Sequence, residues 1–326
     1  IFYFMATQPT NPNLDEWPIP DNFKRETVMA SADRLPLDVL SVMPDTAPVG
    51  VLQLVHGMCE HKERYIPFMQ YMADHGWVCI IHDHRGHGRS IRKTEDLGYF
   101  YAGGYRALVN DIRIVNGLIR QRHPDLPLVL FGHSMGSMAV RAYVKRDDRH
   151  LAGLVVCGCP GYTPSAMAGR WLAWGIGLFA GGHARPKLLQ RLSVGAFNFR
   201  FQNEGSANAW VCSDPEIVAA YDRNPLCNYQ FTVNGFRNMF DLMLYAYNPK
   251  GWAMHNPDMP VRFISGEDDP CMFDRAHFDA AVERMHEVGY RNVSFKLYPR
   301  MRHEILNEIG KEQVWADLLA HIETLR

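Results

Sequence analysis

The chain has 326 residues, which is long enough for two domains or for one large α/β domain with a sizeable core. Apolar residues make up 47% and charged residues 21%, so the composition excludes a disordered chain. The 34 basic and 35 acidic side chains nearly cancel, which excludes the basic excess of a nucleic-acid-binding protein.

The seven cysteines are scattered and odd in number, which predicts free thiols and a cytoplasmic location. Met5 is interpreted as the natural start, with residues 1–4 as additions, inside an N-terminal extension over residues 1–22. The most apolar stretch, residues 171–182, is shorter than the roughly 20 residues of a transmembrane helix. The chain is therefore not expected to cross a membrane.

Two short alternating runs, residues 26–30 and 37–43, predict a β-hairpin. From residue 49, buried apolar runs alternate with amphipathic patterns, which predicts a mostly parallel sheet with helices on both faces. Strands are predicted over residues 49–55, 77–81, 128–131, 151–157, 261–265 and 293–298. Helices are predicted over residues 65–75, 108–119, 134–145, 273–288 and 311–325.

The alternation stops over residues 160–255, which are rich in aromatic residues, glycine and proline and contain no clear strand. The simplest organisation is one α/β core, formed by residues 23–159 and 256–326, with a helical cap inserted at 160–255.

The first chemical signal is Gly132-x-Ser134-x-Gly136, between a predicted buried strand and a predicted helix. This is the context of a nucleophile elbow, in which a sharp turn exposes the serine at the carboxyl edge of the sheet. The glycines allow the tight turn and close packing. Ser134 is therefore the candidate nucleophile, and the backbone N–H of Met135 is a candidate oxyanion donor.

Three motifs stand out together: His56-Gly57-Met58-Cys59-Glu60-His61, Asp83-His84-Arg85-Gly86-His87-Gly88-Arg89-Ser90 and Gly132-His133-Ser134-Met135-Gly136. Through these motifs the chain resembles an α/β-hydrolase over residues 49–160 and 256–326, and it is most similar to the monoacylglycerol lipase and lysophospholipase branch, including bacterial members. Residues 1–22 lie outside the resemblance, and the cap matches loosely, at Phe197-Asn198 and at residues 224–227. The resemblance implies an α/β-hydrolase fold with an inserted helical cap.

The resemblance also implies the rest of a catalytic set. The second oxyanion donor would be the backbone N–H of Met58. The base is expected between the last strand and the last helix, which selects His303. The acid would be Asp269, from the family pattern Gly-x-x-Asp, with the adjacent Asp268 as the alternative. His303 would take the Ser134 proton, and the acid would hold the imidazole in place.

His82, His84 and His87 superficially resemble a zinc site, but their spacing fits a zinc hydrolase poorly and coincides with the family loop. No metal and no cofactor are predicted. The substrate pocket is predicted to include His56, Gly57 and His133, together with three aromatic residues of the cap: Trp171, Trp174 and Phe179.

Residues 151–203 contain five basic side chains and no acidic ones. With the interleaved aromatic residues, this pattern suits an element at a lipid interface, and contact with a membrane surface or a micelle is one interpretation. The other is an ordinary cap that packs its apolar side on the core. The sequence does not indicate an oligomeric state.

The resemblance implies a serine hydrolase that cleaves a small lipid monoester, either monoacylglycerol or lysophospholipid, through an acyl-enzyme. A general carboxylesterase or thioesterase for shorter acyl groups is the alternative. A catalytically silent binding protein and an aminopeptidase relative stay open as more remote readings.

Overall fold

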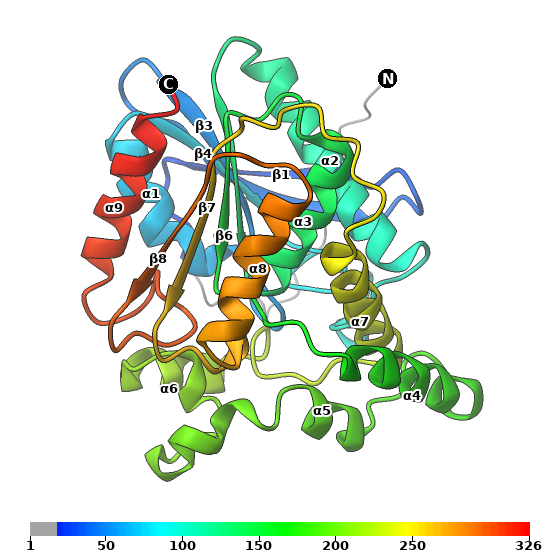
Figure 1. Cartoon of the computed structure of the whole chain (residues 1–326). Helices are drawn as coiled ribbons and strands as arrows, with labels where there is room; N and C mark the ends of the chain where they lie inside the picture. Colours follow the sequence, from blue (N-terminus) through cyan, green and yellow to red (C-terminus); the bar gives the residue numbers. More distant parts are fainter. Residues whose placement is uncertain (1–17) are drawn as a thin grey trace.

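The computed structural model describes residues 18–326, so the predicted start at Met5 and most of the N-terminal extension lie outside the described residues. A sheet of eight strands forms its centre, in the order β1-β2-β4-β3-β5-β6-β7-β8 (Figure 1). The predicted hairpin pairs β1 with β2, and β2 also pairs antiparallel with β4, whereas the remaining pairs are parallel. The strands are β1 (Phe23–Met29), β2 (Pro36–Val42), β3 (Gly50–Val55), β4 (Trp77–His82), β5 (Leu128–His133), β6 (Gly153–Cys157), β7 (Val261–Gly266) and β8 (Val293–Tyr298).

Strands β3 to β6 are buried at every position, which explains their near-continuous apolar sequences. The register between β3 and β5 pairs Val51 with Leu128 and Val55 with Gly132. The chain segments that leave these two strands, at His56 and Ser134, therefore start side by side at the carboxyl edge of the sheet.

Helices cover both faces of the sheet, as the sequence predicts. α1 and α9 pack on one face through residues such as Phe68 and Leu318, and α2, α3 and α8 pack on the other through Ile112, Val140 and Phe278 (Figure 1). These helices are α1 (Ile66–Asp74), α2 (Gly104–Arg122), α3 (Met135–Asp147), α8 (Arg275–Glu287) and α9 (Lys311–Glu323).

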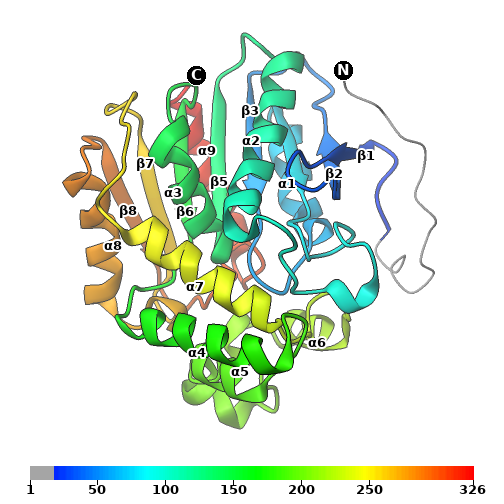
Figure 2. The same ribbon diagram turned by 90° about the vertical axis from the view of Figure 1, so that its right-hand side faces the viewer.

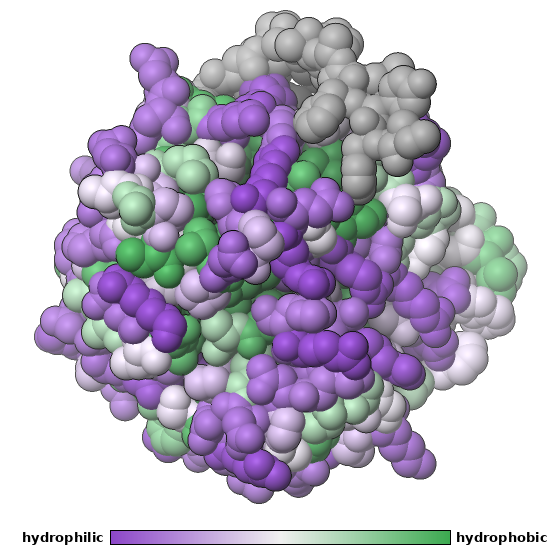
Figure 3. Space-filling model, turned by 90° about the horizontal axis from the view of Figure 1, so that it is seen from above, coloured by the Kyte–Doolittle hydropathy of each residue, from purple (hydrophilic) through white to green (hydrophobic). Residues whose placement is uncertain are grey.

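The segment between β6 and β7 contains α4 (Ser165–Ala180), α5 (Lys187–Ser193), α6 (Pro215–Arg223) and α7 (Val233–Tyr247). These helices gather at one end of the molecule, with α4 alongside α7 (Figures 1 and 2). The opposite end presents mostly hydrophilic residues (Figure 3). We propose that residues 160–255 form a cap over the carboxyl edge of the core. Among the described residues, no helix is both long and apolar enough to cross a membrane.

Candidate active site

The turn from β5 into α3 has the geometry of a nucleophile elbow. Ser134 has a φ of 53°, a conformation that costs free energy for a residue with a side chain. The flanking glycines make the turn possible. A Cβ on Gly136 would lie 2.2 Å from the Val55 carbonyl oxygen, and a Cβ on Gly132 would lie 2.5 Å from that of Gly136. The two glycines therefore let β3, β5 and α3 approach closely and hold the strained serine in place.

The structure brings Ser134, His303 and Asp269 into one hydrogen-bonded chain. Nε2 of His303 lies 2.8 Å from Oγ of Ser134, and Nδ1 of the same ring lies 2.9 Å from Oδ2 of Asp269. His303 and Asp269 are buried. This is the arrangement in which an imidazole can accept the hydroxyl proton while the carboxylate fixes its tautomer.

Several groups hold the Asp269 carboxylate in place. Ser265 Oγ donates to Oδ2 at 3.0 Å, and the Cys271 N–H donates to Oδ1 at 2.8 Å. Burial alone would raise the pKa of Asp269, but the charge of His303 and these hydrogen bonds outweigh it and lower the pKa. The alternative acid, Asp268, lies at the surface and pairs with Arg200 at 2.9 Å. The structure thus places Asp269 against His303.

The loop that follows β3 packs directly on the nucleophile. A Cβ on Gly57 would lie 2.9 Å from the Ser134 Cβ. Met58 follows in this loop, Met135 begins α3, and both residues line the cavity at Ser134. The backbone N–H of Met135 is the first of a helix and has no partner within that helix, so it is free for an oxyanion. The arrangement fits the predicted pair of oxyanion donors.

A buried polar network, which the sequence analysis missed, connects this loop to the elbow. The Glu60 carboxylate accepts hydrogen bonds from the Gly57 N–H and, at 2.9 Å, from Nδ1 of His133. Arg64 pairs with Glu60 at 3.5 Å and forms a two-pronged bond with Glu304. Glu60 belongs to the first family motif and Glu304 directly follows His303, but the role of both acids depends on contacts between distant segments that the sequence does not reveal.

A cavity of about 740 Å³ opens at Ser134 between core and cap. Its core side includes His133 and His303. From the cap, Trp210 packs against the His303 ring with 5.1 Å between ring centroids. The cap contributes residues 190–199 and part of α7. Much of the lining consists of flexible or aromatic apolar side chains, namely Met58, Met135, Met138, Met239, Phe240 and Met243.

Five of the six predicted pocket residues do not line this cavity, so that part of the prediction is wrong. Trp171, Trp174 and Phe179 project outward because α4 buries its small residues instead; Phe179 is 93% exposed. Gly57 packs behind Ser134. His56 is fully buried beneath the loop, where its Nε2 accepts the His84 N–H at 2.9 Å and its Nδ1 donates to the Gly57 carbonyl at 2.8 Å.

Within residues 18–326, one group has the spacing for a metal ion, formed by Asp269, Cys271 and His303. Its carboxylate and imidazole already bond to each other, and the second imidazole nitrogen faces Ser134, so the geometry favours a catalytic triad. His82, His84 and His87 are instead buried rings: His84 and His87 pack beside His56, and His82 packs against His84.

Comparison with known proteins agrees with this geometry. A family model described as "Serine aminopeptidase, S33" matches residues 46–310. The chain belongs to this family of α/β-hydrolases, and thus to a class of serine hydrolases. The predicted family resemblance and fold class are confirmed.

Three relatives illustrate the similarity. The monoacylglycerol lipase of Mycolicibacterium smegmatis is 29% identical over 86% of this chain and 90% of its own length. A monoglyceride lipase homolog of Monkeypox virus is 34% identical with the same coverage. The crystal structure of a highly thermostable carboxyl esterase from Bacillus coagulans superposes with a TM-score of 0.84 at 25% identity, covering 94% of this chain and 99% of that one.

Proposed function

We propose that this protein hydrolyses carboxylic esters of lipid monoesters, such as monoacylglycerol or lysophospholipid, through an acyl-enzyme at Ser134. The observation that carries the proposal is the hydrogen-bonded chain Asp269–His303–Ser134, whose Ser134 and His303 line a 740 Å³ cavity together with methionine and phenylalanine side chains. Such a cavity is large enough for a medium or long acyl chain. Relatives named as monoacylglycerol lipases and an esterase support the same reaction.

In the proposed reaction, His303 removes the Ser134 proton as Oγ attacks the ester carbonyl. The N–H groups of Met58 and Met135 stabilise the oxyanion, and protonated His303 gives its proton to the leaving alcohol. Water, activated by His303, then attacks the acyl-enzyme and releases the fatty acid. Asp269 stabilises the imidazolium in both steps. This sequence of steps uses only side chains and amides of this chain and requires no cofactor.

An aminopeptidase, the activity in the family's description, needs a carboxylate that is free to bind a substrate amine. Glu60 and Glu304 line the cavity, but Arg64 pairs with both, and His133 also bonds to Glu60. Their charges are therefore already compensated, which favours an ester over a peptide with a charged amine.

We also propose that the cap makes peripheral contact with lipid surfaces. Exposed apolar side chains occur on α4 and α5, including Trp171, Leu178, Phe179 and Leu192. The exposed basic residues Lys187 and Arg191 lie on α5 beside them. Apolar side chains flanked by positive charge suit a lipid interface.

The test is hydrolysis of p-nitrophenyl esters from acetyl to palmitoyl, with monoolein and lysophosphatidylcholine as natural-type substrates. We expect the highest kcat/KM for medium or long chains, with no activity in Ser134→Ala. Activity confined to acetyl and butyryl esters would replace the proposal with the short-chain esterase or thioesterase. A folded protein that cleaves none of these esters would overturn it.

A further inference from the structure

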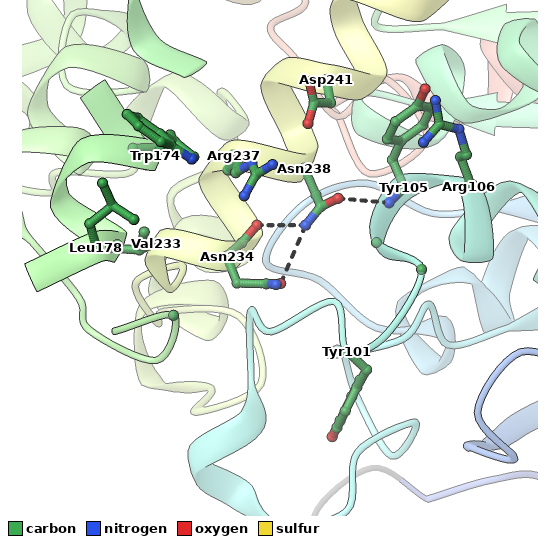
Figure 4. A pocket seen from close by; sticks show the side chains of 15 residues that line it. Tyr101, Tyr105, Arg106, Trp174, Leu178, Val233, Asn234, Arg237, Asn238 and Asp241 are labelled. Carbon is green, nitrogen blue, oxygen red and sulfur yellow. Dashed lines mark hydrogen bonds between the residues drawn. The ribbon is translucent and has the colours of Figure 1, made fainter. Parts of the chain in front are cut away.

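A second cavity, of about 420 Å³, lies between the start of α2 and the cap helices α4 and α7 (Figure 4). It shares no lining residue with the cavity at Ser134, and the proposed reaction does not use it. We call it the α2–cap pocket. Its walls come from residues 101–106 in the core and from residues within 173–182 and 233–241 of the cap.

The charges around the α2–cap pocket do not cancel. Arg106 and Arg237 line it with exposed side chains, and neither forms an ion pair with any residue of the described chain; the Arg106 guanidinium lies over the Tyr105 ring, 5.2 Å from its centroid. The acidic lining residue, Asp241, is already paired with Arg170 at 2.5 Å. Two positive charges therefore face the pocket without a counter-charge, which attracts an anion.

Two helix N-termini add to this positive character. Gly104 begins α2 and Val233 begins α7; both line the pocket, and neither helix has an acidic residue in its first turn. The partial positive charge at a helix N-terminus stabilises an anion placed nearby. Because N–H groups in the first turns already have partners, such as that of Val233 on the Ala184 carbonyl and that of Tyr105 on Asn238, only the helix dipoles contribute, and they reinforce the two arginines without replacing them.

Hydrogen bonds between α2 and α7 fix the wall of the pocket where these two helices meet. Asn238 accepts the Tyr105 N–H at 2.9 Å and donates to the Asn234 carbonyl at 2.9 Å, as Figure 4 shows. A Cβ on Gly104 would lie 1.9 Å from Oδ1 of Asn238, so this close approach requires glycine. The contacts join core and cap at the pocket without using the arginines, which remain available for a ligand.

One side of the pocket is apolar. Trp174, Leu178 and Val233 lie together on the side of the pocket away from Arg106 (Figure 4). Leu178 is 62% exposed, so this wall reaches the surface beside the exposed Phe179. A ligand that fits has a negative head group and an apolar chain that leaves along α4.

We propose that the α2–cap pocket binds the anionic head group, phosphate or carboxylate, of a lipid-like amphiphile, with Arg106 and Arg237 as its counter-charges. The chain would lie against Trp174 and Leu178. This site goes beyond the proposed function because binding there requires no chemistry at Ser134. A phospholipid in a membrane and a free amphiphile present the same chemistry, and the experiment separates them.

The first arm uses dodecyl phosphate that carries a photoreactive diazirine in its chain. We expect it to label the peptide containing residues 171–182, equally in the wild type and in Ser134→Ala. The double variant Arg106→Gln/Arg237→Gln should bind dodecyl phosphate about tenfold more weakly or worse, as expected for the loss of charge-assisted hydrogen bonds. The uncharged dodecyl maltoside should bind both proteins alike.

The matched control is Arg120→Gln/Arg149→Gln, which removes the same charge from two exposed arginines near His150: Arg120 lies in the last turn of α2, and Arg149 follows α3. It should keep the wild-type affinity. Labelling confined to peptides of the Ser134 cavity, or equal loss of binding in both double variants, would overturn the proposal. Because Ser134→Ala is included, this result is independent of whether the protein hydrolyses esters.

The second arm measures co-sedimentation with vesicles of phosphatidylcholine alone or with one-fifth phosphatidylglycerol. Extra binding to the anionic vesicles that disappears in Arg106→Gln/Arg237→Gln identifies a membrane lipid as the source. Arginine-dependent binding of dodecyl phosphate without this vesicle effect identifies a free amphiphile. Arginine-independent binding in both arms contradicts the site.

Discussion

The carboxylate of Glu60 accepts a hydrogen bond from Nδ1 of His133, 2.9 Å away, immediately beside the candidate nucleophile. Glu60 belongs to the loop after β3, and His133 is the last residue of β5. Nε2 of His133 lies 3.2 Å from the His303 carbonyl oxygen, so His133 connects the loop after β3 and the loop of His303 to the end of β5. Although burial disfavours both charges, their mutual attraction raises the pKa of His133 and lowers the pKa of Glu60 to about 2.

Glu60→Gln should therefore reduce catalysis because Gly57 and His133 are held less firmly in position, and not because a contact with the substrate is lost. The variant keeps the shape of the side chain but removes its charge, so it loosens the hold on Gly57 and on His133. We expect kcat on a soluble p-nitrophenyl ester to fall about 10- to 100-fold, because small displacements of reacting groups have effects of this order, while KM changes little. Steady-state kinetics separate the two constants.

The matched control for this variant is Glu312→Gln, which removes the same charge from an exposed position in the first turn of α9. It should retain the wild-type kcat. An unchanged kcat in Glu60→Gln, with circular dichroism showing a folded protein, would mean that Glu60 only stabilises the fold.

The two adjacent aspartates allow a direct test of the acid. Asp269→Asn should lower kcat by about 10³- to 10⁴-fold, because an amide at this position favours the wrong tautomer of the imidazole. Asp268→Asn should leave kcat near the wild-type value, since Asp268 pairs with Arg200 at the surface. The reverse order of the two effects in ester hydrolysis would move the acid to Asp268.

The sequence predicted the core of the fold well because its signals are local. Buried strands with near-continuous apolar runs, such as β3 and β5, and the elbow around Ser134 each depend on a short stretch of chain. The assignment of Asp269 and His303 relied in addition on the family resemblance. The position of a residue can therefore be predicted from the sequence when its partners are near in the chain or when a family motif identifies it.

The cap could not be predicted to the same depth. Its aromatic residues were expected to face the substrate, but α4 turns Trp171 and Trp174 outward, and α7 supplies Phe240 and Met243 to the cavity instead. In the sequence, both helices are apolar on more than one face, and only the packing of α4 against α7 decides which face is inward. Glu60 was missed for a similar reason, since His133 lies 73 residues away.

Stability should depend on pH through the buried histidines. Burial lowers the pKa of His82 and of His87 to about 4, compared with about 6.5 in an unfolded chain. Between these values the unfolded chain binds more protons, so the free energy of unfolding should fall as the pH falls below about 6.5. Each histidine contributes up to about 3 kcal/mol, present above pH 6.5 and lost by about pH 4.

Urea unfolding at several pH values measures this effect. We expect a clearly lower free energy of unfolding at about pH 5 than at pH 7.5, and a shallower dependence in His82→Leu, which has nothing to protonate. The same free energy at both pH values would show that these rings accept protons in the folded protein.

Replacing two helical glycines by alanine, one in the elbow and one outside it, distinguishes the close packing at the elbow from ordinary helix propensity. In an unstrained helix, replacing glycine by alanine stabilises a protein by about 0.5–1 kcal/mol. Gly117, in α2, has no atom within 4 Å of an added Cβ, so Gly117→Ala should show this gain in urea unfolding.

At Gly136, in α3, the Cβ would lie 2.2 Å from the Val55 carbonyl oxygen and 2.4 Å from that of His56. Because both obstacles are backbone atoms, β3 and α3 must separate, and Gly136→Ala should lose about 2 kcal/mol or more and most of its esterase activity. A gain in stability at both positions would show that the elbow does not require this close packing, and that its second glycine serves another purpose.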